Sequence, residues 1–130
     1  MVKEFKNEIR VYYEDTDSGG VVYYANYLKF LERARTEALY SIGLSNQKLL
    51  KDYKTLIIVK SCNIDFKKIS KLEDKLQIYS SVKLFKKASF EMIQKIKKNN
   101  ELIVEAKVQL VTVNVSGKPI KVPDILRKLI

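Results

Sequence analysis

Hydrophobic positions are spaced in two different ways along the chain, and the first spacing predicts a helix. Between Asn26 and Ile42 the apolar residues recur at intervals of three and four positions: Tyr27, Leu28, Leu31, Ala34, Ala38 and Ile42. This spacing places them on one face of a helix. Gly43 is suited to ending that helix, and Ser45 to capping a short helical turn that runs through Leu49 and Leu50.

Alternation of apolar and polar residues, the second spacing, predicts strands over most of the remaining chain. The strands are expected at residues 4–13, 55–66, 75–85, 88–97 and 101–115. One face of the third strand should carry Leu76, Ile78, Ser80, Val82 and Leu84. Turns are expected at Asn99–Asn100, because Asn tolerates positive φ, and at residues 116–119. Pro123 can open a closing helix through Leu129.

One long helix combined with about five strands is typical of an α+β fold. The helix would lie in the curve of an antiparallel sheet. The chain has 130 residues, a mass of 15.1 kDa, and no linker or repeat, so residues 1–130 are expected to form a single domain. Long strands in so small a domain leave sheet edges, and dimerisation is one way to cover them.

The composition is that of a soluble globular protein, with 46% hydrophobic and 31% charged residues. No apolar run approaches the roughly 18 residues that are needed to span a bilayer. Residues 1–10 lack the apolar core of a secretory signal, and the single Cys cannot form an internal disulfide. We therefore expect a cytoplasmic protein without a transmembrane segment.

The chain contains no His, and this narrows the possible chemistry. Ser–His and Cys–His nucleophile pairs are excluded within the chain, as is a His-ligated metal site. One Cys cannot build a thiolate site. No metal and no cofactor are expected, and an enzyme of this composition must move protons with Asp, Glu, Tyr, Lys or backbone groups.

The net charge of +10 favours polyanionic partners such as nucleic acid, anionic lipid or phosphorylated small molecules. An equally simple interpretation is solubility, because most of the basic residues are lysines scattered over solvent-facing positions. A nucleic-acid-binding module is supported by the charge alone. No recognised nucleic-acid motif is present, so we expect no nucleic acid partner.

The segment from Tyr12 to Leu39 carries the most chemical information, because an acidic, Gly-rich turn joins a strand to the long helix there. A calcium loop starting at Asp15 fails, because position five, which needs an oxygen ligand, is Gly19 and position twelve, which needs Glu, is Asn26. A phosphate loop fails as well, because no Lys follows the glycines. A carboxylate held beside a helix N-terminus suits the residues, since free N–H groups and the helix dipole stabilise a developing oxyanion.

Two runs in this segment carry a family resemblance: Asp15-Thr-Asp-x-x-Gly-Val-Val-Tyr23 and Asn26-Tyr-Leu-x-Phe-x-Glu-x-Ala-Arg35. They resemble the hotdog-fold acyl-CoA thioesterases, in particular the YbgC-type branch, which is related to 4-hydroxybenzoyl-CoA thioesterase. Asp74 stands where this family usually has Gly-Asp. The resemblance implies a hotdog fold, in which an antiparallel sheet wraps the long helix and subunits pair edge to edge. It also implies hydrolysis of a thioester to a free acid and a thiol.

The resemblance assigns roles to particular residues. Asp17 matches the family's catalytic carboxylate, which acts as nucleophile or general base. Backbone amides near Tyr24 and Ala25 would polarise the thioester carbonyl. The common YbgC-type motif has His at the position of Tyr24, and Tyr cannot replace an imidazole acid at neutral pH, because its usual pKa is about 10. Glu32 matches a helix acid of the family, to which we assign a structural role.

Other residues of interest have simpler interpretations beside the functional ones. Asp15 is interpreted as a turn or capping residue, and Arg33 and Arg35 as helix-surface charges or ion-pair partners. Lys86 and Lys87 end a strand, and related enzymes place bases there that hold the phosphates of coenzyme A. The alternative bases are Lys67, Lys68, Lys71, Lys97 and Lys98.

The leading hypothesis is therefore an acyl-CoA thioesterase that works as a homodimer or homotetramer. Acyl carrier protein is an alternative acyl donor, because an acidic carrier would also suit a basic surface. A hotdog protein that binds acyl groups with weak hydrolysis is the second hypothesis. The nucleic-acid-binding module is the third.

Overall fold

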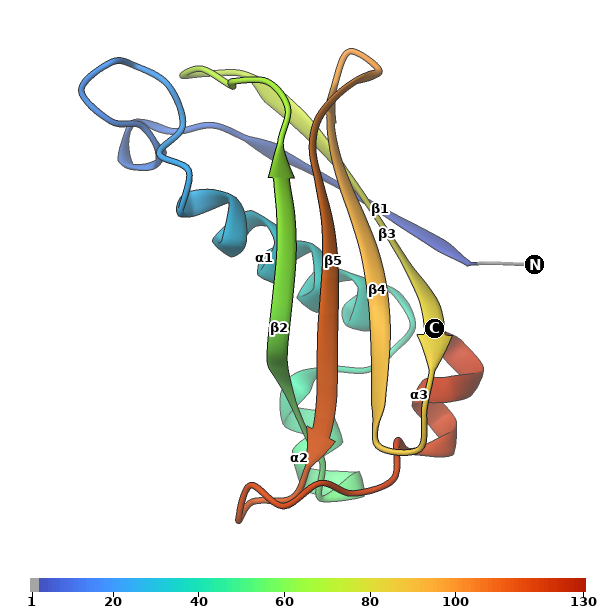
Figure 1. Ribbon diagram of the computed structural model, residues 1–130. Coiled ribbons are helices and arrows are strands. Elements are labelled where there is room, and N and C mark those ends of the chain that lie inside the picture. Colours follow the sequence, from blue (N-terminus) through green and yellow to red (C-terminus); the bar gives the residue numbers. More distant parts are fainter. Residues whose placement is uncertain (1–2) are drawn as a thin grey trace.

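The computed structural model describes residues 3–130 and consists of one antiparallel sheet with a long helix against it (Figure 1). The elements in chain order are β1 (Glu4–Arg10), a 3-10 turn (Tyr13–Asp15), α1 (Asn26–Ser41), α2 (Asn46–Tyr53), β2 (Leu56–Phe66), β3 (Lys75–Phe85), β4 (Ser89–Lys98), β5 (Glu101–Val113) and α3 (Asp124–Leu129). The five strands follow the order β1-β3-β4-β5-β2. The predicted α+β class, with a long helix and a five-stranded antiparallel sheet, is confirmed.

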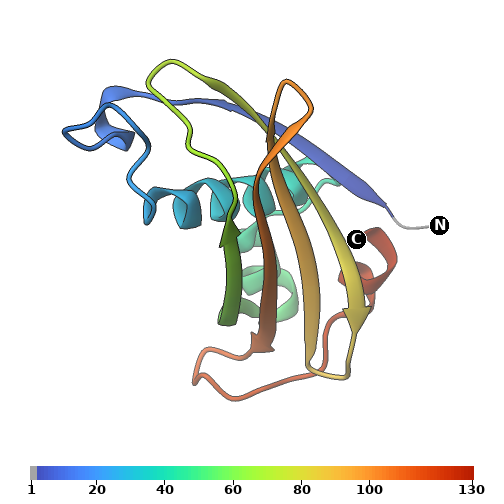
Figure 2. The same cartoon turned by 45° about the horizontal axis from the view of Figure 1, so that its top comes forward.

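The sheet curves around α1, which lies across its concave face (Figure 2). The helix buries a stripe of apolar side chains, with Tyr27, Phe30, Leu31, Ala34, Ala38 and Leu39 each less than a tenth exposed. Against them pack wholly buried strand residues such as Leu76, Ile78 and Ile96. Each such side chain contributes about 1.5–3 kcal/mol through removal from water. Leu28 departs from the predicted apolar face, since it is 48% exposed at the border of the stripe.

The predicted ends of the helices are confirmed. Gly43 follows α1 with φ +80°, a conformation that favours glycine. The hydroxyl of Ser45 accepts a hydrogen bond from the amide of Lys48 at 3.0 Å and so caps α2. Ser45 thus opens a helix of eight residues, longer than the predicted turn. At the end of the chain, α3 begins directly after Pro123.

Strand boundaries agree closely with the alternation in the sequence, although β5 ends at Val113 instead of residue 115 and two further local differences occur. β1 ends at Arg10 instead of residue 13, because the chain turns into the 3-10 helix. In β3, a bulge between Val82 and Leu84 shifts the alternation, so Leu84 is 48% exposed and not on the buried face. The hairpin turn at Asn99 and Asn100 is confirmed, with φ values of 50° and 65°.

The edge strand β2 is much less covered than the centre of the sheet. Helix α1 packs mainly on β1 and β3, and the short helix α2 packs on β2. Apolar side chains of β2 consequently remain in solvent, with Ile58 47%, Val59 49% and Phe66 46% exposed. Strand β4, by contrast, alternates regularly between buried and half-buried residues.

Residues 3–130 were also compared with the requirements of a membrane span and of a metal site. None of the helices there combines the length and the hydropathy that crossing a membrane requires. The same residues contain no group of three or more Cys, Asp and Glu side chains placed to hold a metal ion.

Candidate active site

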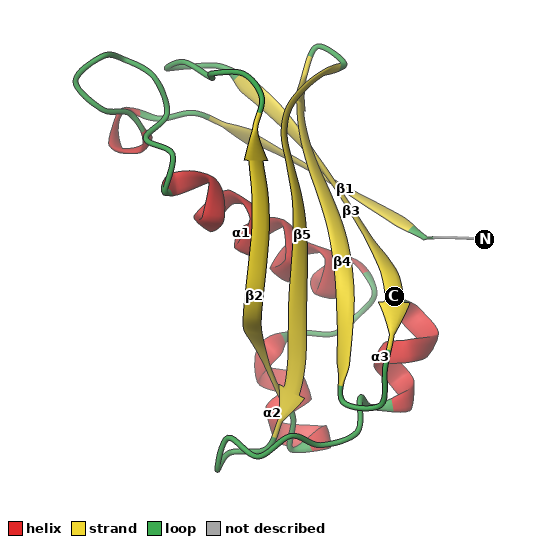
Figure 3. Cartoon of the chain, viewed as in Figure 1, coloured by secondary structure: helices red, strands yellow, loops and turns green. Residues whose placement is uncertain are grey.

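The loop between the 3-10 turn and α1 turns back on itself (Figure 3), and it contains Asp17. Thr16 and Val22 form an antiparallel bridge, and the amide of Asp17 donates to the carbonyl of Val21 at 2.9 Å. The amide of Gly20 then donates to the carbonyl of Asp17 at 3.0 Å. Gly20 has φ +76°, so this turn requires glycine. The loop therefore fixes the backbone of Asp17 through its own hydrogen bonds.

The carboxylate of Asp17 is exposed and has one oxygen available for chemistry. Its Oδ1 accepts a hydrogen bond from the amide of Gly19 at 2.8 Å. A Cβ on Gly19 would approach Oδ1 to 3.3 Å, so a residue without a side chain lets this contact form. Within residues 3–130, Oδ2 accepts no hydrogen bond. The side chain is thus oriented by one oxygen, and the other is free.

The loop rests on the segment between β2 and β3, residues 67–74. The amide of Val22 donates to the carbonyl of Ser70 at 2.8 Å, and the amide of Leu72 to that of Gly20 at 3.2 Å. The phenol of Tyr27, in the first turn of α1, hydrogen-bonds to the Ser70 hydroxyl at 2.8 Å. Burial raises the pKa of Tyr27, which keeps the phenol neutral as a partner for Ser70. Ser70, itself fully buried, thereby ties the loop to the start of the helix.

Asp15 supports this loop from inside. Its side chain is only 6% exposed, and Oδ2 accepts the amide of Tyr12 at 2.9 Å. Its carbonyl accepts the amide of Tyr23 at 3.0 Å and the Nδ2 of Asn26 at 2.9 Å. The interpretation of Asp15 as a turn and capping residue agrees with these contacts.

The start of α1 offers two free backbone donors next to this loop. The helix begins at Asn26, and Ala25 is its N-cap with helical dihedral angles. The amides of Asn26 and Tyr27 donate to the carbonyls of Tyr23 and Tyr24 at 2.9 and 3.2 Å. Among the residues that the structure describes, the amides of Tyr24 and Ala25 find no acceptor. Unpaired amides at a helix start are the donors that an oxyanion requires.

Aromatic side chains surround the helix start on the side of β2. The ring of Tyr24 lies 5.0 Å from that of Tyr23 and 5.9 Å from that of Phe66, measured between centroids. Phe66 also contacts Tyr27 at 5.8 Å. Phe66 was not predicted from the sequence. It is the last residue of β2, and only the sheet order shows that this strand ends beside the helix start.

Lys86 and Lys87 lie at the opposite end of the sheet from Asp17, in the β3–β4 hairpin (Figures 1 and 2). Both side chains are exposed. The guanidinium of Arg127 donates to the carbonyls of both residues, and the amide of Val122 donates to the carbonyl of Lys87 at 2.8 Å. These hydrogen bonds fix the hairpin to the carboxyl-terminal segment of the chain. Within one chain, the hairpin lies far from Asp17. Arg127 had no signal in the sequence, because its contact joins residues about forty positions apart.

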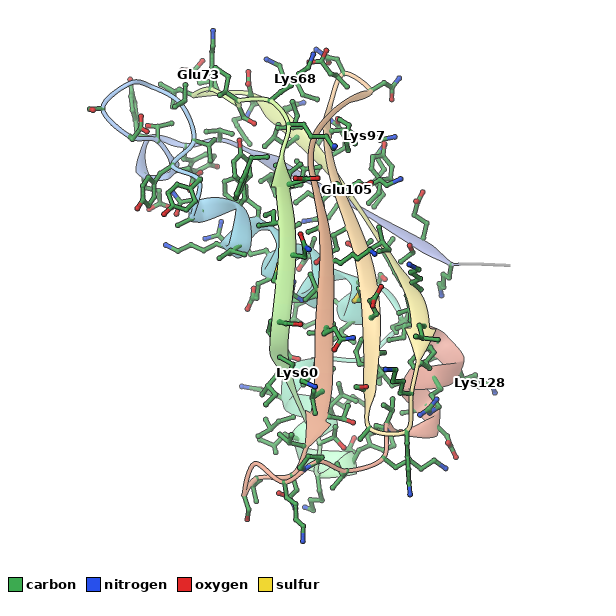
Figure 4. All side chains as sticks on the ribbon, in the orientation of Figure 1. Lys60, Lys68, Glu73, Lys97, Glu105 and Lys128 are labelled. Atoms are coloured by element: carbon green, nitrogen blue, oxygen red, sulfur yellow. The ribbon has the colours of Figure 1, made fainter. Side chains whose placement is uncertain are left out.

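The alternative lysines lie at the Asp17 end, where most of them have partners (Figure 4 labels Lys68 and Lys97). Lys68 pairs with Glu101 at 2.9 Å, and Lys98 pairs with Asp74 at 2.9 Å. Lys97 lies over the ring of Tyr79 at 5.3 Å. Lys71 is exposed, and its backbone bridges to Val21 in the Asp17 loop.

Asp74 organises the segment on which the loop rests. One carboxylate oxygen accepts the amide of Lys71 at 2.8 Å, and the other pairs with Lys98. Burial raises the pKa of Asp74, but the hydrogen bond from Lys71 and the contact with Lys98 outweigh burial and hold it below its usual value. Glu73 occupies the position at which the resembling family usually has Gly, and its φ is +72°.

Arg35 is not the surface charge that its helix position suggested. It is half-buried, and its Nη1 donates to Oε1 of Gln94 at 2.9 Å. Gln94 is fully buried and donates in turn to the carbonyl of Leu31 at 3.0 Å and to the hydroxyl of Ser80 at 2.9 Å. The interpretation as a surface charge fails because Arg35 hydrogen-bonds to Gln94 of β4, a residue 59 positions away in the sequence. Arg33 is exposed, as expected. Glu32 is exposed as well, and no contact within residues 3–130 supports the structural role assigned to it.

Comparison with known proteins gives consistent matches over nearly the whole chain. The sequence profile of the thioesterase-like superfamily matches residues 11–130. The acyl-CoA thioesterase YbgC of Haemophilus influenzae is 39% identical over 120 residues, which cover 92% of this chain and 88% of that protein. The acyl-CoA thioester hydrolase YbgC of Escherichia coli O6:H1 is 38% identical over 111 residues, covering 85% and 82%.

Solved structures show the same architecture. The crystal structure of a probable thioesterase from Bartonella henselae is 33% identical, with a TM-score of 0.87 over 95% of this chain and 100% of that chain. The 4-hydroxybenzoyl-CoA thioesterase from Pseudomonas sp. strain CBS-3 has a TM-score of 0.91 over 98% and 99% of the chains, at 22% identity. At that identity the second likeness concerns the fold alone, which is the hotdog fold expected from the sequence.

Proposed function

The chain belongs to the thioesterase-like superfamily, and from this membership we propose an acyl-CoA thioesterase whose catalytic carboxylate is Asp17. The reaction converts an acyl-CoA thioester and water into a free acid and CoA. One observation carries the site assignment. An exposed carboxylate with a free oxygen sits on the loop that leads into a helix start whose two amides, at Tyr24 and Ala25, have no acceptor within residues 3–130.

Two routes can use this arrangement. As a nucleophile, Asp17 bonds to the thioester carbon, the C–S bond breaks and the CoA thiolate leaves; water then hydrolyses the mixed anhydride, which releases the acid and restores the Asp17 carboxylate, and the proton given up by the water goes to the thiolate. As a general base, Asp17 takes a proton from water while the water oxygen bonds to the carbon, and the departing thiolate receives that proton. In both routes the carbonyl oxygen becomes negative, and the amides of Tyr24 and Ala25 would donate to it.

The Tyr24 side chain is not needed in either route. The proposed contribution of this position comes from its backbone N–H, which any residue other than Pro can supply. Its ring, which is 61% exposed, contacts the Tyr23 ring at a tilt and the Phe66 ring edge to face. The His of the common YbgC-type motif can therefore be replaced here without removing the oxyanion donors.

A second copy of the chain explains how Lys86 and Lys87 can serve the site. In the sheet, Ile58 of β2 pairs with Val111 of β5, which pairs with Ser89 at the Lys86–Lys87 hairpin. Phe66 marks the other end of β2, next to Tyr24. Two chains joined along β2 in antiparallel fashion, by a two-fold axis, would bring the hairpin end of one chain to the Asp17 end of the other. We therefore keep Lys86 and Lys87 as ligands of the CoA phosphates, acting across a homodimer.

Further parts of the proposal concern partners and location. Two such dimers can associate into a homotetramer. Acyl carrier protein is an alternative acyl donor, because the charge of +10 suits an acidic carrier as well as CoA. A cytoplasmic location is proposed, since free acyl-CoA is the substrate.

Replacement of Asp17 by Asn tests the catalytic assignment. Asp17→Asn keeps the size and can still accept the Gly19 amide, but it removes the base and nucleophile. We expect kcat for acyl-CoA to fall by about a hundredfold or more, with KM little changed. Glu14→Gln is the matched control, because Glu14 is an exposed carboxylate of the adjacent 3-10 turn. It should keep full activity.

The measurement is release of free thiol from acetyl-, octanoyl-, palmitoyl- and benzoyl-CoA, with circular dichroism to show that each variant is folded. The panel also defines the acyl preference. Near-normal turnover by Asp17→Asn would remove it from the mechanism. A folded wild-type protein that binds these thioesters without turnover would favour the acyl-binding alternative.

A further inference from the structure

One side of α1 carries four side chains at intervals of four, three and four positions: Leu28, Glu32, Arg35 and Leu39. Such intervals place residues in one row along a helix, and we call these four residues the α1 row. Three of them, Glu32, Arg35 and Leu39, line a cavity of about 270 Å³ that β2 also lines. Leu28, at the start of the row, is 48% exposed. The α1 row therefore lies on the side of the helix that is turned toward β2.

The two charges of the α1 row have opposite signs and no counter-ion. Among the described residues, neither Glu32 nor Arg35 forms an ion pair. Glu32 is exposed, whereas Arg35 is half-buried and, within residues 3–130, donates only to Gln94. Burial lowers the pKa of Arg35. A half-buried cation is stabilised by an anion in direct contact with it, so both charges can accept a partner from another molecule.

The α1 row is complementary to a second copy of itself that runs antiparallel. When such a pair of helices is centred between residues 33 and 34, Glu32 faces Arg35 of the partner subunit, and Leu28 faces Leu39 of the partner subunit. Two-fold symmetry repeats each contact in the opposite sense. A parallel pair in register would instead place each charge against its own copy, which is repulsive. The order apolar, acidic, basic, apolar thus favours the antiparallel pair alone.

A homodimer joined along β2 supplies this arrangement of the helices. Antiparallel pairing of two β2 strands places the two-fold axis perpendicular to the sheet, so both α1 helices lie on the same face and run in opposite directions. Helix α1 begins on the outer side of β2 and runs from there across the sheet (Figures 1 and 2). A partner that pairs with β2 therefore brings its own α1 alongside.

We propose that α1 forms the second half of the homodimer interface, in which Glu32 of each chain binds Arg35 of the partner subunit. Gln94 holds the guanidinium from within its own chain, and the remaining N–H donors bind the carboxylate in bidentate fashion. The two ion pairs set the antiparallel orientation and select a second copy over other proteins. This inference rests on the β2-paired homodimer of the proposed function and adds the side chains that recognise the partner.

Glu32→Lys tests the ion pair in the full-length protein. It places like charges together at both symmetric contacts, so we expect the dimer dissociation constant to rise at least about tenfold. Glu37→Lys is the matched control, because it makes the same change of charge at an exposed residue of α1 that lies outside the row and lines a separate cavity beside β1. Sedimentation velocity over a range of concentrations measures both. A rise no larger than that of Glu37→Lys would overturn the proposal.

Mixing two variants then identifies the partner of Glu32. Chains with Glu32→Lys and chains with Arg35→Glu each meet like charges in their own homodimers, whereas in a mixed dimer all facing charges are opposite. We expect the mixture to dimerise at least about tenfold more tightly than either variant alone. Equal association of the mixture and the separate variants would refute the pairing.

Neutral variants answer the same question without placing a negative charge beside Gln94. Arg35→Gln can still donate to Gln94. Adding Glu32→Gln to Arg35→Gln should weaken the dimer less than Glu32→Gln weakens it in the wild type, and additive effects would contradict the contact.

The separate parts of the model can fail separately. Dissociation by Ile58→Lys but not by Glu32→Lys would leave the β2 pairing in place and refute the α1 contact. A wild-type protein that stays monomeric at every concentration would overturn both contacts. Turnover of Asp17→Asn tests the hydrolysis alone.

Discussion

The two edge strands of the sheet, β1 and β2, expose different kinds of side chain. Every second residue of β1 is charged: Glu4, Lys6, Glu8 and Arg10. On β2, by contrast, Ile58 and Val59 are each about half exposed, at 47% and 49%. Charges on an edge strand disfavour pairing with another chain, whereas an apolar edge favours it. We therefore call β1 the closed edge, because its charges disfavour pairing with another chain. We call β2 the open edge, because its exposed apolar side chains favour such pairing.

The open edge, β2, is also the one that ends at the candidate active site. β1 leads into the Asp17 loop through Val11, which is buried and bonded to residues 73 and 74. β2 ends at Phe66, whose half-exposed ring contacts Tyr24 at the helix start. A partner that pairs with β2 would therefore cover the aromatic side of the site. In the proposed homodimer, this difference between the edges would link subunit association to catalysis.

The largest expected effect comes from breaking the open edge. Ile58→Lys places a charge where the second copy would pack, and we expect the dimer dissociation constant to rise about a hundredfold. Activity should fall together with the dimer. Sedimentation velocity over a range of concentrations, with assays at the same concentrations, measures both effects.

Glu4→Lys on the charged edge is the control for Ile58→Lys. Glu4 is exposed at the start of β1, so this change should leave mass and activity as they were. A fully active wild-type monomer at every concentration would contradict both the dimer and the contrast between a closed β1 edge and an open β2 edge.

The next largest effect is expected at the Lys86–Lys87 hairpin, which a partner paired through β2 would place near Asp17. Replacing Lys86 and Lys87 together with Ala should raise KM for acyl-CoA by about tenfold, flatten its salt dependence and change kcat less. The comparison pair is Lys67 and Lys68, which lie at the Asp17 end of the same chain. Steady-state kinetics of both double variants decide between them.

A thioester of pantetheine lacking the nucleotide serves as the second substrate for these variants. If KM for this substrate rises equally when Lys86 and Lys87 are replaced, phosphate binding is not the role of these lysines. If only the Lys67–Lys68 pair raises KM for acyl-CoA, the phosphates bind within one chain and the edge-to-edge arrangement loses this support.

The sequence predicted the helices and strands better than their arrangement in space. Local alternation and spacing are physical consequences of burial on one face, so β3 was predicted with its observed bounds. The catalytic role of Asp17 comes from a contiguous motif and stays a prediction. The roles of Phe66 and Arg35 depend on which strands become neighbours, and the sheet order β1-β3-β4-β5-β2 is not written in any local pattern. The bulge that exposes Leu84 escaped prediction for the same reason, because a bulge is a property of two paired strands.

A smaller effect is expected where the closed edge meets the active-site loop, at Asp74. The folded pKa of Asp74 is lowered, so its contribution is present above the unfolded pKa of about 3.9 and is lost as pH falls through the folded value. Asp74→Asn should therefore cost about 1–2 kcal/mol at pH 7 and little near pH 2. Urea unfolding at several pH values measures this.

Asp65→Asn on β2 is the control for Asp74→Asn. Asp65 is 75% exposed and its nearest cation, on Lys67, is 3.8 Å away, so its loss should hardly change stability at any pH. An Asp74→Asn deficit that persists unchanged at pH 2 would show that packing, and not the carboxylate charge, holds this end of β1.

The smallest effect, of opposite sign, is expected from the neighbouring residue Glu73. Its φ of +72° costs a residue with a side chain about 1–2 kcal/mol, whereas glycine adopts this conformation without strain. Part of that gain is lost, because glycine is more disordered in the unfolded chain, so Glu73→Gly should stabilise the protein by about 0.5 kcal/mol. Lys54→Gly, at φ +54° after α2, should act in the same direction, and Glu14→Gly, which lacks a positive φ, should destabilise. Urea midpoints of the three variants rank them. Destabilisation by Glu73→Gly would mean that the side chain of Glu73 contributes more to closing the β1 edge than its backbone conformation costs.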